Sequence, residues 1–206
     1  MDTYRGAPAL LTDMYELTMV DAALAAEKAN GTPMASRQTT FEIFGRRLPH
    51  DRRYGVVVGT GRLLEQLQNF QFTDEQIDYC SDFLSDDTLE WMRNFCFSGS
   101  ISGYREGDLY FPGSPILTVQ GTFAECQILE TLALSILNHD CAVATAAARM
   151  AAAADGRVII EMGARRTHEE SAVAGARAAY IAGFTSTSDL AAGYRWNIPV
   201  GGTSAH

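Results

Sequence analysis

Three short apolar runs near the end of the chain constrain its fold more than any other feature. They lie at residues 158–160, 181–184 and 198–200, and each has the length of a buried strand. The runs recur at intervals of roughly 20 residues, and helical patterns fill the intervals. Two parallel strands need a connection of this kind, because the chain must return to the same edge of the sheet. The sequence therefore predicts a parallel βαβαβ arrangement that does not complete a barrel.

Polar and glycine-rich segments follow these runs, at the strand ends where ligands collect in parallel α/β folds. The segments are EMGARR (161–166), TSTSD (185–189) and GGTSAH (201–206). Paired arginines grip oxyanions in bidentate fashion, and glycines let backbone N–H groups come close to a ligand. The residues thus predict an anionic, phosphate-bearing substrate. The alternative is that Arg165 and Arg166 form structural ion pairs and that Gly201-Gly202 is a plain loop.

The first 121 residues mix helical and strand signals and are predicted to form an α+β domain. Helical periodicity begins near Thr12 and stops at Asn30-Gly31, a common C-terminal stop. Thr73 and Gln76 form a capping box for another helix. Strands are predicted at 40–44 and 56–58, helices at 63–70 and after Asp87, and an antiparallel meander at 101–119.

The second predicted domain comprises residues 122–206. Thr122 and Glu125 form a capping box in front of one long buried helix. Thr167 with Glu170 forms a further box, before the helix that joins the first two parallel strands. The fold class is therefore α/β, with the boundary near residue 121 set by the change of pattern.

Charge and hydropathy exclude several classes of partner. Sixteen basic and twenty-five acidic residues give a net charge of −9, which disfavours nucleic acid and anionic lipid. No window has the length and apolar character of a membrane span. Charged residues occupy the N-terminus where a signal peptide needs an apolar core, so we expect a cytoplasmic protein. The four cysteines lack metal or redox spacing and are expected to be buried free thiols.

Five ordered motifs resemble those of nicotinate phosphoribosyltransferases. They are LTDMYELTM (11–19), FEIFGRRLP (41–49), the series from Glu106-Gly107 through Phe111-Pro112 to Glu130-Thr131, GARR (163–166) and GTSAH (202–206). In order and spacing they cover nearly the whole chain, so the resemblance is far more specific than any isolated glycine or arginine cluster. The family chain is considerably longer, and we expect this sequence to be its N-terminal part, a fragment.

The resemblance implies a type II phosphoribosyltransferase: an N-terminal α+β sandwich domain, then the first strands of an incomplete, irregular α/β barrel. It also implies a head-to-tail homodimer with composite sites. The implied reaction joins nicotinate to 5-phosphoribosyl 1-diphosphate, releasing pyrophosphate and giving nicotinate mononucleotide in NAD salvage. ATP hydrolysis drives it and Mg²⁺ assists it. A ligase-type glycosyltransferase and phosphoprotein is therefore expected, and no metal ligand is assigned.

The resemblance also assigns site residues. It implies that His206 is catalytic and is transiently phosphorylated by ATP, because a phosphohistidine stores energy and adds negative charge beside the substrate. It gives Tyr15 as the ring that stacks on the pyridine, often across the dimer interface. The substrate-binding residues that it implies are Tyr15, Arg165, Arg166, Met162, Asp189, Gly202 and Thr203.

Two of these residues depart from the family pattern. Met162 stands where related enzymes commonly place a phenylalanine, although a thioether contact with a ring is still worth roughly 0.3–1.5 kcal/mol. Asp189 stands where nicotinate enzymes usually carry asparagine and nicotinamide enzymes carry aspartate. A carboxylate there repels the nicotinate carboxylate but accepts a hydrogen bond from an amide. Nicotinate remains the predicted substrate, and nicotinamide is the alternative.

Two further hypotheses remain open from the sequence. The arginine and glycine clusters alone also suit a different barrel enzyme that acts on a sugar phosphate. The chain is also compatible with an inactive piece that needs its missing C-terminal half.

Overall fold

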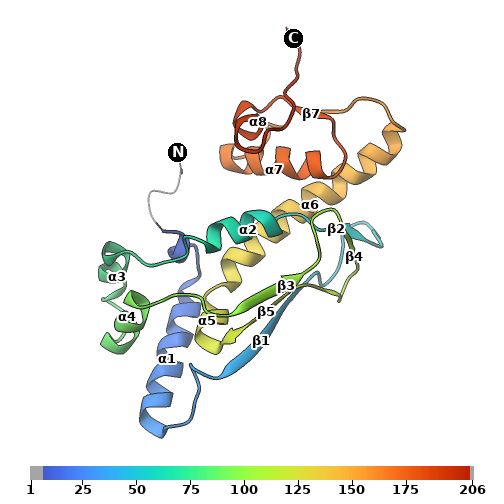
Figure 1. Ribbon diagram of the computed structural model, residues 1–206. Coiled ribbons are helices and arrows are strands. Elements are labelled where there is room, and N and C mark those ends of the chain that lie inside the picture. Colours follow the sequence, from blue (N-terminus) through green and yellow to red (C-terminus); the bar gives the residue numbers. More distant parts are fainter. Residues whose placement is uncertain (1–6, 205–206) are drawn as a thin grey trace. The chain divides into compact units, whose positions relative to one another are not determined.

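The computed structural model of the chain describes residues 7–204 and mixes helices with small sheets, which confirms the prediction of a mixed α/β chain (Figure 1). The chain divides into two compact units. The first unit comprises Met1–Ile43, Arg62–Gly103 and Leu117–Ser135, and the second comprises Phe44–Gly61, Tyr104–Ile116 and Ile136–His206. The predicted domain boundary near residue 121 stays a prediction.

Helix α1 (Met14–Asn30) packs against two other helices of the first unit. Its predicted stop is confirmed, because Gly31 follows it in the left-handed conformation with φ 65°. Leu17 is buried on the inner face of the helix, and α1 packs against α4 (Asp86–Arg93) and α5 (Phe123–Gln127). A short 3₁₀ turn, η1 (Pro8–Leu10), precedes α1.

The sheet of the first unit has three strands in the order β1–β5–β3 (Figure 1). These are β1 (Gln38–Phe44), β5 (Pro115–Thr122) and β3 (Ser100–Gly103). Strands β3 and β5 are antiparallel, with Ser100 opposite Gln120. The predicted meander is therefore confirmed for β3 and β5. Its middle strand β4 (Leu109–Tyr110) pairs instead with β2 (Gly55–Val56) in the second unit.

Two short helices and an aromatic cluster complete the first unit. The helices are α2 (Thr60–Leu67) and α3 (Asp74–Cys80). The first two residues of α2 belong to the second unit. The capping box of Thr73 and Gln76 is confirmed at the start of α3. Phe70, Phe72 and Phe95 meet edge to face, with ring centroids 5.8–6.4 Å apart. This geometry adds to the burial energy of the three rings.

The capping box of Thr122 and Glu125 is also confirmed, but the helix behind it is shorter than predicted. Helix α5 ends at Gln127, and a separate helix α6 (Glu130–Ala154) follows. The Glu125 carboxylate accepts hydrogen bonds from the amide and hydroxyl of Ser98, each at 2.8 Å, and from the Thr122 amide. Burial raises the pKa of Glu125, but these hydrogen bonds outweigh burial and leave the pKa below its ordinary value.

Replacing Thr122 by alanine should lower the free energy of unfolding by about 1 kcal/mol, because the amide of Glu125 loses its capping acceptor. The matched control is Thr167→Ala. The predicted Thr167/Glu170 box is wrong: His168 is the N-cap of the next helix, without a side-chain capping bond. Urea unfolding should therefore separate the two variants. Equal losses would contradict the assignment.

The second unit contains a parallel β-α-β-α series. Its elements are β6 (Ile160–Glu161), α7 (Glu169–Ile181), β7 (Ser186–Thr187) and α8 (Leu190–Trp196). The strand predicted at 181–184 is misplaced, because α7 runs on to Ile181 and the chain turns at Gly183 before β7 begins. Helix α7 contributes to two small apolar clusters, one in which Ala178 packs with Val58 and Ala144 of α6, and one that includes Ala176 and Ile198.

A partly buried ion pair also belongs to the second unit. Glu106 lies between β3 and β4 and accepts two hydrogen bonds from Arg177 of α7, at 2.8 and 2.7 Å. The same carboxylate accepts from the amides of Gly59 and Gly61, at 2.8 and 3.3 Å. The Arg177 guanidinium lies 5.5 Å from the ring centroid of Trp196. Glu106 therefore connects three separate segments of the unit.

Cys80, Cys126 and Cys141 are buried free thiols as expected, whereas Cys96 is exposed, so the expectation of burial is wrong there. Burial raises the pKa of the Cys141 thiol to about 11. Within residues 7–204 no helix is long and apolar enough to span a membrane.

Candidate functional site

The ends of the parallel strands in the second unit converge as the sequence predicts. Strands β6 and β7 pair in parallel, and Thr187 forms a parallel bridge with Val200 of the third run. The Ser188 amide donates to the Glu161 carbonyl at 2.8 Å, and the Gly201 amide donates to the Thr187 carbonyl at 2.9 Å. The three polar segments therefore leave the same edge of one small sheet.

The first of these segments carries Met162, Arg165 and Arg166. It forms a tight turn in which the Arg166 amide donates to the Gly163 carbonyl at 2.8 Å. Both arginines are exposed, and 49% of the Met162 surface is exposed. These side chains therefore lie at the surface beside the strand ends, where a ligand can reach them.

The second segment contains Asp189, and its carboxylate has a structural partner. One carboxylate oxygen accepts from the Ala192 amide at 3.0 Å and caps α8. The Asp189 amide donates to the Thr187 hydroxyl, also at 3.0 Å. Asp189 therefore starts a helix, a role that an aspartate at an N-cap performs in any protein.

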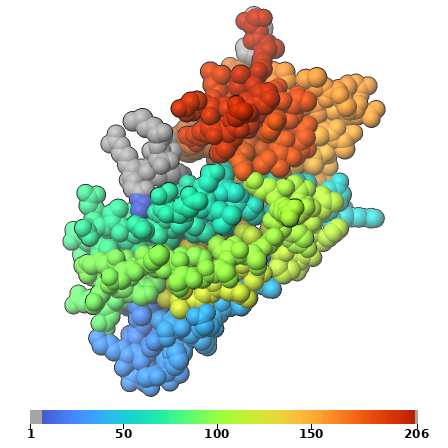
Figure 2. Space-filling view, in the orientation of Figure 1, coloured from blue at the N-terminus to red at the C-terminus, as the bar shows by residue number. Residues whose placement is uncertain are grey.

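The third segment, residues 201–204, projects from the second unit at the red end of the chain (Figure 2). Gly202 and Thr203 are exposed, and a Cβ added to Gly202 would meet no atom within 4 Å. The predicted catalytic residue, His206, lies outside the described residues.

Glu161 and Thr187, which the sequence did not single out, connect the strand ends. The Thr187 hydroxyl donates to the Glu161 carboxylate at 2.7 Å, and the Gly163 amide donates to the other oxygen of that carboxylate. Thr187 is fully buried. The two residues are 26 positions apart, so no local pattern in the sequence signals this pair.

Tyr15 belongs to the first unit, whereas the strand ends belong to the second. It lies in the first turn of α1 and 43% of its surface is exposed. Burial and a hydrogen bond with the Glu130 carboxylate raise the pKa of Tyr15 to about 12, so the phenol is neutral at physiological pH. Its neighbour Glu16 is fully buried and accepts from the Thr131 amide and hydroxyl, at 2.8 and 2.6 Å. These contacts fix the start of α1, from which the Tyr15 ring projects.

The described residues do not supply a metal centre. No group of three or more histidine, cysteine, aspartate or glutamate side chains in residues 7–204 could hold a metal ion. The implied Mg²⁺ stays a prediction, and no step of the reaction is derived through it.

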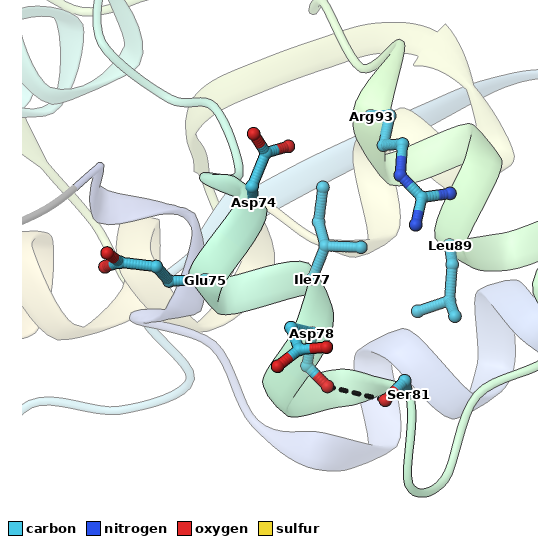
Figure 3. Close-up of a pocket in the computed structure, with 7 residues that line it drawn as sticks. All are labelled: Asp74, Glu75, Ile77, Asp78, Ser81, Leu89 and Arg93. Carbon is cyan, nitrogen blue, oxygen red and sulfur yellow. Dashed lines mark hydrogen bonds between the residues drawn. The ribbon is translucent and has the colours of Figure 1, made fainter.

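A surface depression of about 470 Å³ lies on the first unit, between α3 and α4 (Figure 3). Figure 3 shows Asp74 of α3 and Arg93 of α4 on either side of Ile77. The other lining residues are Glu75, Asp78, Ser81 and Leu89. Its lining includes none of the predicted site residues, and charges of both signs surround it, so we assign it no ligand.

The second unit thus has the parallel β-α-β arrangement of α/β folds, which commonly bind ligands at their strand ends. The chain belongs to the nicotinate phosphoribosyltransferase family: the model of the nicotinate phosphoribosyltransferase (NAPRTase) N-terminal domain matches residues 10–138. The resemblance seen in the sequence is therefore confirmed.

Proteins similar to this chain carry the name of the same family. Nicotinate phosphoribosyltransferase pncB1 of Mycobacterium tuberculosis (strain CDC 1551 / Oshkosh) is 60% identical over 197 residues, which cover 96% of this chain and 43% of that protein. Nicotinate phosphoribosyltransferase of Bacillus subtilis (strain 168) is 40% identical over 200 residues, 96% of this chain and 40% of that protein. The crystal structure of human nicotinic acid phosphoribosyltransferase matches with a TM-score of 0.85 at 31% identity, over 95% of this chain and 39% of that chain. The chain spans less than half the length of these proteins.

Proposed function

We propose that the chain is the N-terminal part of a cytoplasmic nicotinate phosphoribosyltransferase that forms nicotinate mononucleotide in NAD salvage. In this proposal β6, β7 and the run that ends at Val200 are the first strands of an irregular α/β barrel. The observation that carries the proposal is the convergence of Arg165, Arg166 and the glycine-rich third segment at one edge of a parallel sheet, in a chain of this family. Such an edge is the usual ligand site of α/β folds.

The proposed reaction requires these residues to bind two anionic substrates. The ring nitrogen of nicotinate forms a bond to C1 of the phosphoribosyl group, while the bond from C1 to the pyrophosphate oxygen breaks and pyrophosphate leaves. Both substrates are anionic, so the Arg165 guanidinium can hold a carboxylate or phosphate through charge-assisted hydrogen bonds. Arg166 supports it, and the Gly202 amide and Thr203 hydroxyl offer further donors. Holding both substrates in this way removes much of the entropic barrier.

In the proposed reaction, ATP phosphorylates His206. A ring nitrogen of the imidazole bonds to the γ-phosphorus while the bond from that phosphorus to the bridging oxygen breaks and ADP leaves, and water later removes the phosphoryl group from the phosphohistidine as phosphate. Mg²⁺ remains part of the proposed reaction.

Tyr15 has a separate role in the proposal. Because its phenol is neutral and its ring is partly exposed, the ring can stack on the pyridine of nicotinate and orient it. The proposed assembly is a homodimer in which Tyr15 of one subunit completes the site of the other. Met162 is the proposed contact on the opposite face of the pyridine.

The alternative substrate, nicotinamide, depended on Asp189, and the capping of α8 gives that residue a different explanation. Asparagine caps a helix as well as aspartate does. We therefore expect Asp189→Asn to change the ratio of kcat/KM for nicotinate and nicotinamide by less than about threefold, with little effect on stability. Steady-state kinetics with each substrate measures the ratio. A tenfold gain for nicotinate would restore a specificity role for Asp189.

The test of the function uses the chain alone and a chimera in which the chain is joined to the part of the M. tuberculosis relative beyond its match. We expect the chimera to form nicotinate mononucleotide from nicotinate and 5-phosphoribosyl 1-diphosphate, with stimulation by ATP, and the chain alone to form none. Consumption of nicotinamide only would make the substrate wrong. Turnover of neither pyridine would favour a different sugar-phosphate enzyme.

A further inference from the structure

We propose that Glu161 is a positioning residue for the substrate-binding segments, because its carboxylate joins the ends of β6 and β7. The proposal rests on the proposed function, since it concerns the same strand ends. Glu161 does not need to touch substrate in this role. It fixes the turn that carries Met162, Arg165 and Arg166 relative to the second and third segments.

The directions of the hydrogen bonds require an acceptor at each of the two side-chain oxygens of Glu161. The Asp189 amide can only donate, so the Thr187 hydroxyl accepts from it and directs its single proton to Glu161. The Gly163 amide can also only donate, and it donates to the other oxygen of Glu161. Both oxygens of the Glu161 side chain therefore accept, and a glutamine could satisfy only one of the two donors.

Burial makes this arrangement costly to break. Thr187 is fully buried, so a hydroxyl proton that loses its acceptor cannot turn to water instead. The backbone of Thr187 also pairs with the third run, accepting from the Gly201 amide at 2.9 Å and donating to the Pro199 carbonyl at 3.0 Å. A shift of Thr187 would therefore also displace the segment that contains Gly202 and Thr203. One carboxylate thus couples three segments.

The glycine at position 163 fits the same explanation. A Cβ at this position would lie 2.5 Å from the nearer oxygen of Glu161, which is closer than two such atoms approach. The carboxylate would have to move away from the Gly163 amide. By contrast, a Cβ at Gly175, inside α7, would meet nothing within 4 Å. Gly163→Ala therefore displaces the carboxylate, and Gly175→Ala is its matched control.

The first experiment measures amide hydrogen exchange by NMR in the 206-residue chain. Glu161→Ala and Gly163→Ala should each accelerate exchange at residue 163 by about tenfold or more, because the amide loses its acceptor. Gly175→Ala should leave this rate unchanged. Equal exchange in the wild type and Glu161→Ala would overturn the coupling, whatever the activity of the enzyme.

The second experiment measures kinetics in the chimera. Glu161→Gln and Thr187→Val should each lower kcat/KM by about 10- to 100-fold, because misplaced binding groups lose orientation. Thr187→Ser keeps the hydroxyl and should recover most of the loss, and the double variant should be no worse than either single one. Additive losses, or a Glu161→Gln enzyme within twofold of the wild type, would overturn the positioning role. An inactive wild-type chimera would instead contradict the proposed function.

Discussion

Replacing Glu106 by glutamine should lower the free energy of unfolding of the chain by about 3–5 kcal/mol at neutral pH. The substitution leaves the Arg177 guanidinium without its carboxylate while only 13% of that side chain is exposed. A buried charge that loses its partner costs more than the pair contributed, because the desolvation penalty remains. The amides of Gly59 and Gly61 lose an ionised acceptor as well. Chemical unfolding of the two proteins under the same conditions measures the difference.

A double-mutant cycle separates the pair from its surroundings. Arg177→Met keeps the length and part of the packing of the side chain over Trp196. If the loss comes from breaking the Glu106–Arg177 pair, adding Arg177→Met to Glu106→Gln should recover part of the stability. A double variant that is less stable by the sum of the two single losses would mean that the two residues act independently.

The loss of stability caused by Glu106→Gln should also depend on pH. Burial raises the pKa of Glu106, but the hydrogen bonds from Arg177 and the two amides, together with the charge of Arg177, hold it below its ordinary value of 4.5. A carboxyl group whose pKa is lower in the folded state contributes stability that is complete above the unfolded pKa. That stability is lost as the pH falls through the folded pKa. The gap between wild type and Glu106→Gln should therefore be constant near neutrality and shrink below pH 4.5.

Local signals in the sequence predicted the parts of the fold that depend on neighbouring residues. The capping boxes at Thr73 and Thr122 involve residues three positions apart, and both are present. The parallel strands followed from the crossover length alone. The run at 181–184 was wrong because four apolar residues fit the end of a helix as well as a strand.

In the candidate site, too, the sequence predicted the residues that a local pattern marks and missed those whose partners are distant in the chain. Arg165 and Arg166 were predicted because residues after a strand end share a place in every α/β fold. Glu161 was missed because its partner, Thr187, is 26 residues away, and Glu106 was missed because Arg177 is 71 residues away. Only the folded chain pairs these side chains, so no pattern of spacing reveals them.

The second large effect is expected at Arg165 and concerns activity. In the chimera, Arg165→Ala should lower kcat/KM by about 10- to 150-fold, the value of one or two hydrogen bonds to a charged group. Arg165→Lys should recover little of the loss, because a lysine keeps the charge but cannot hold an oxyanion in bidentate fashion. Stability should change little, since the side chain is exposed.

Two further arginines make this prediction specific. Arg157 of the second unit is also exposed, and it donates to the Ala154 carbonyl at 3.0 Å, away from the strand ends, so Arg157→Ala should leave kcat/KM unchanged. Arg166→Ala should cause a smaller loss than Arg165→Ala, because Arg166 is the supporting residue of the pair. A large loss with Arg166→Ala and none with Arg165→Ala would exchange the two roles. Equal and small losses in all three variants would mean that the substrate anion binds elsewhere, because a guanidinium that holds it cannot be removed without cost.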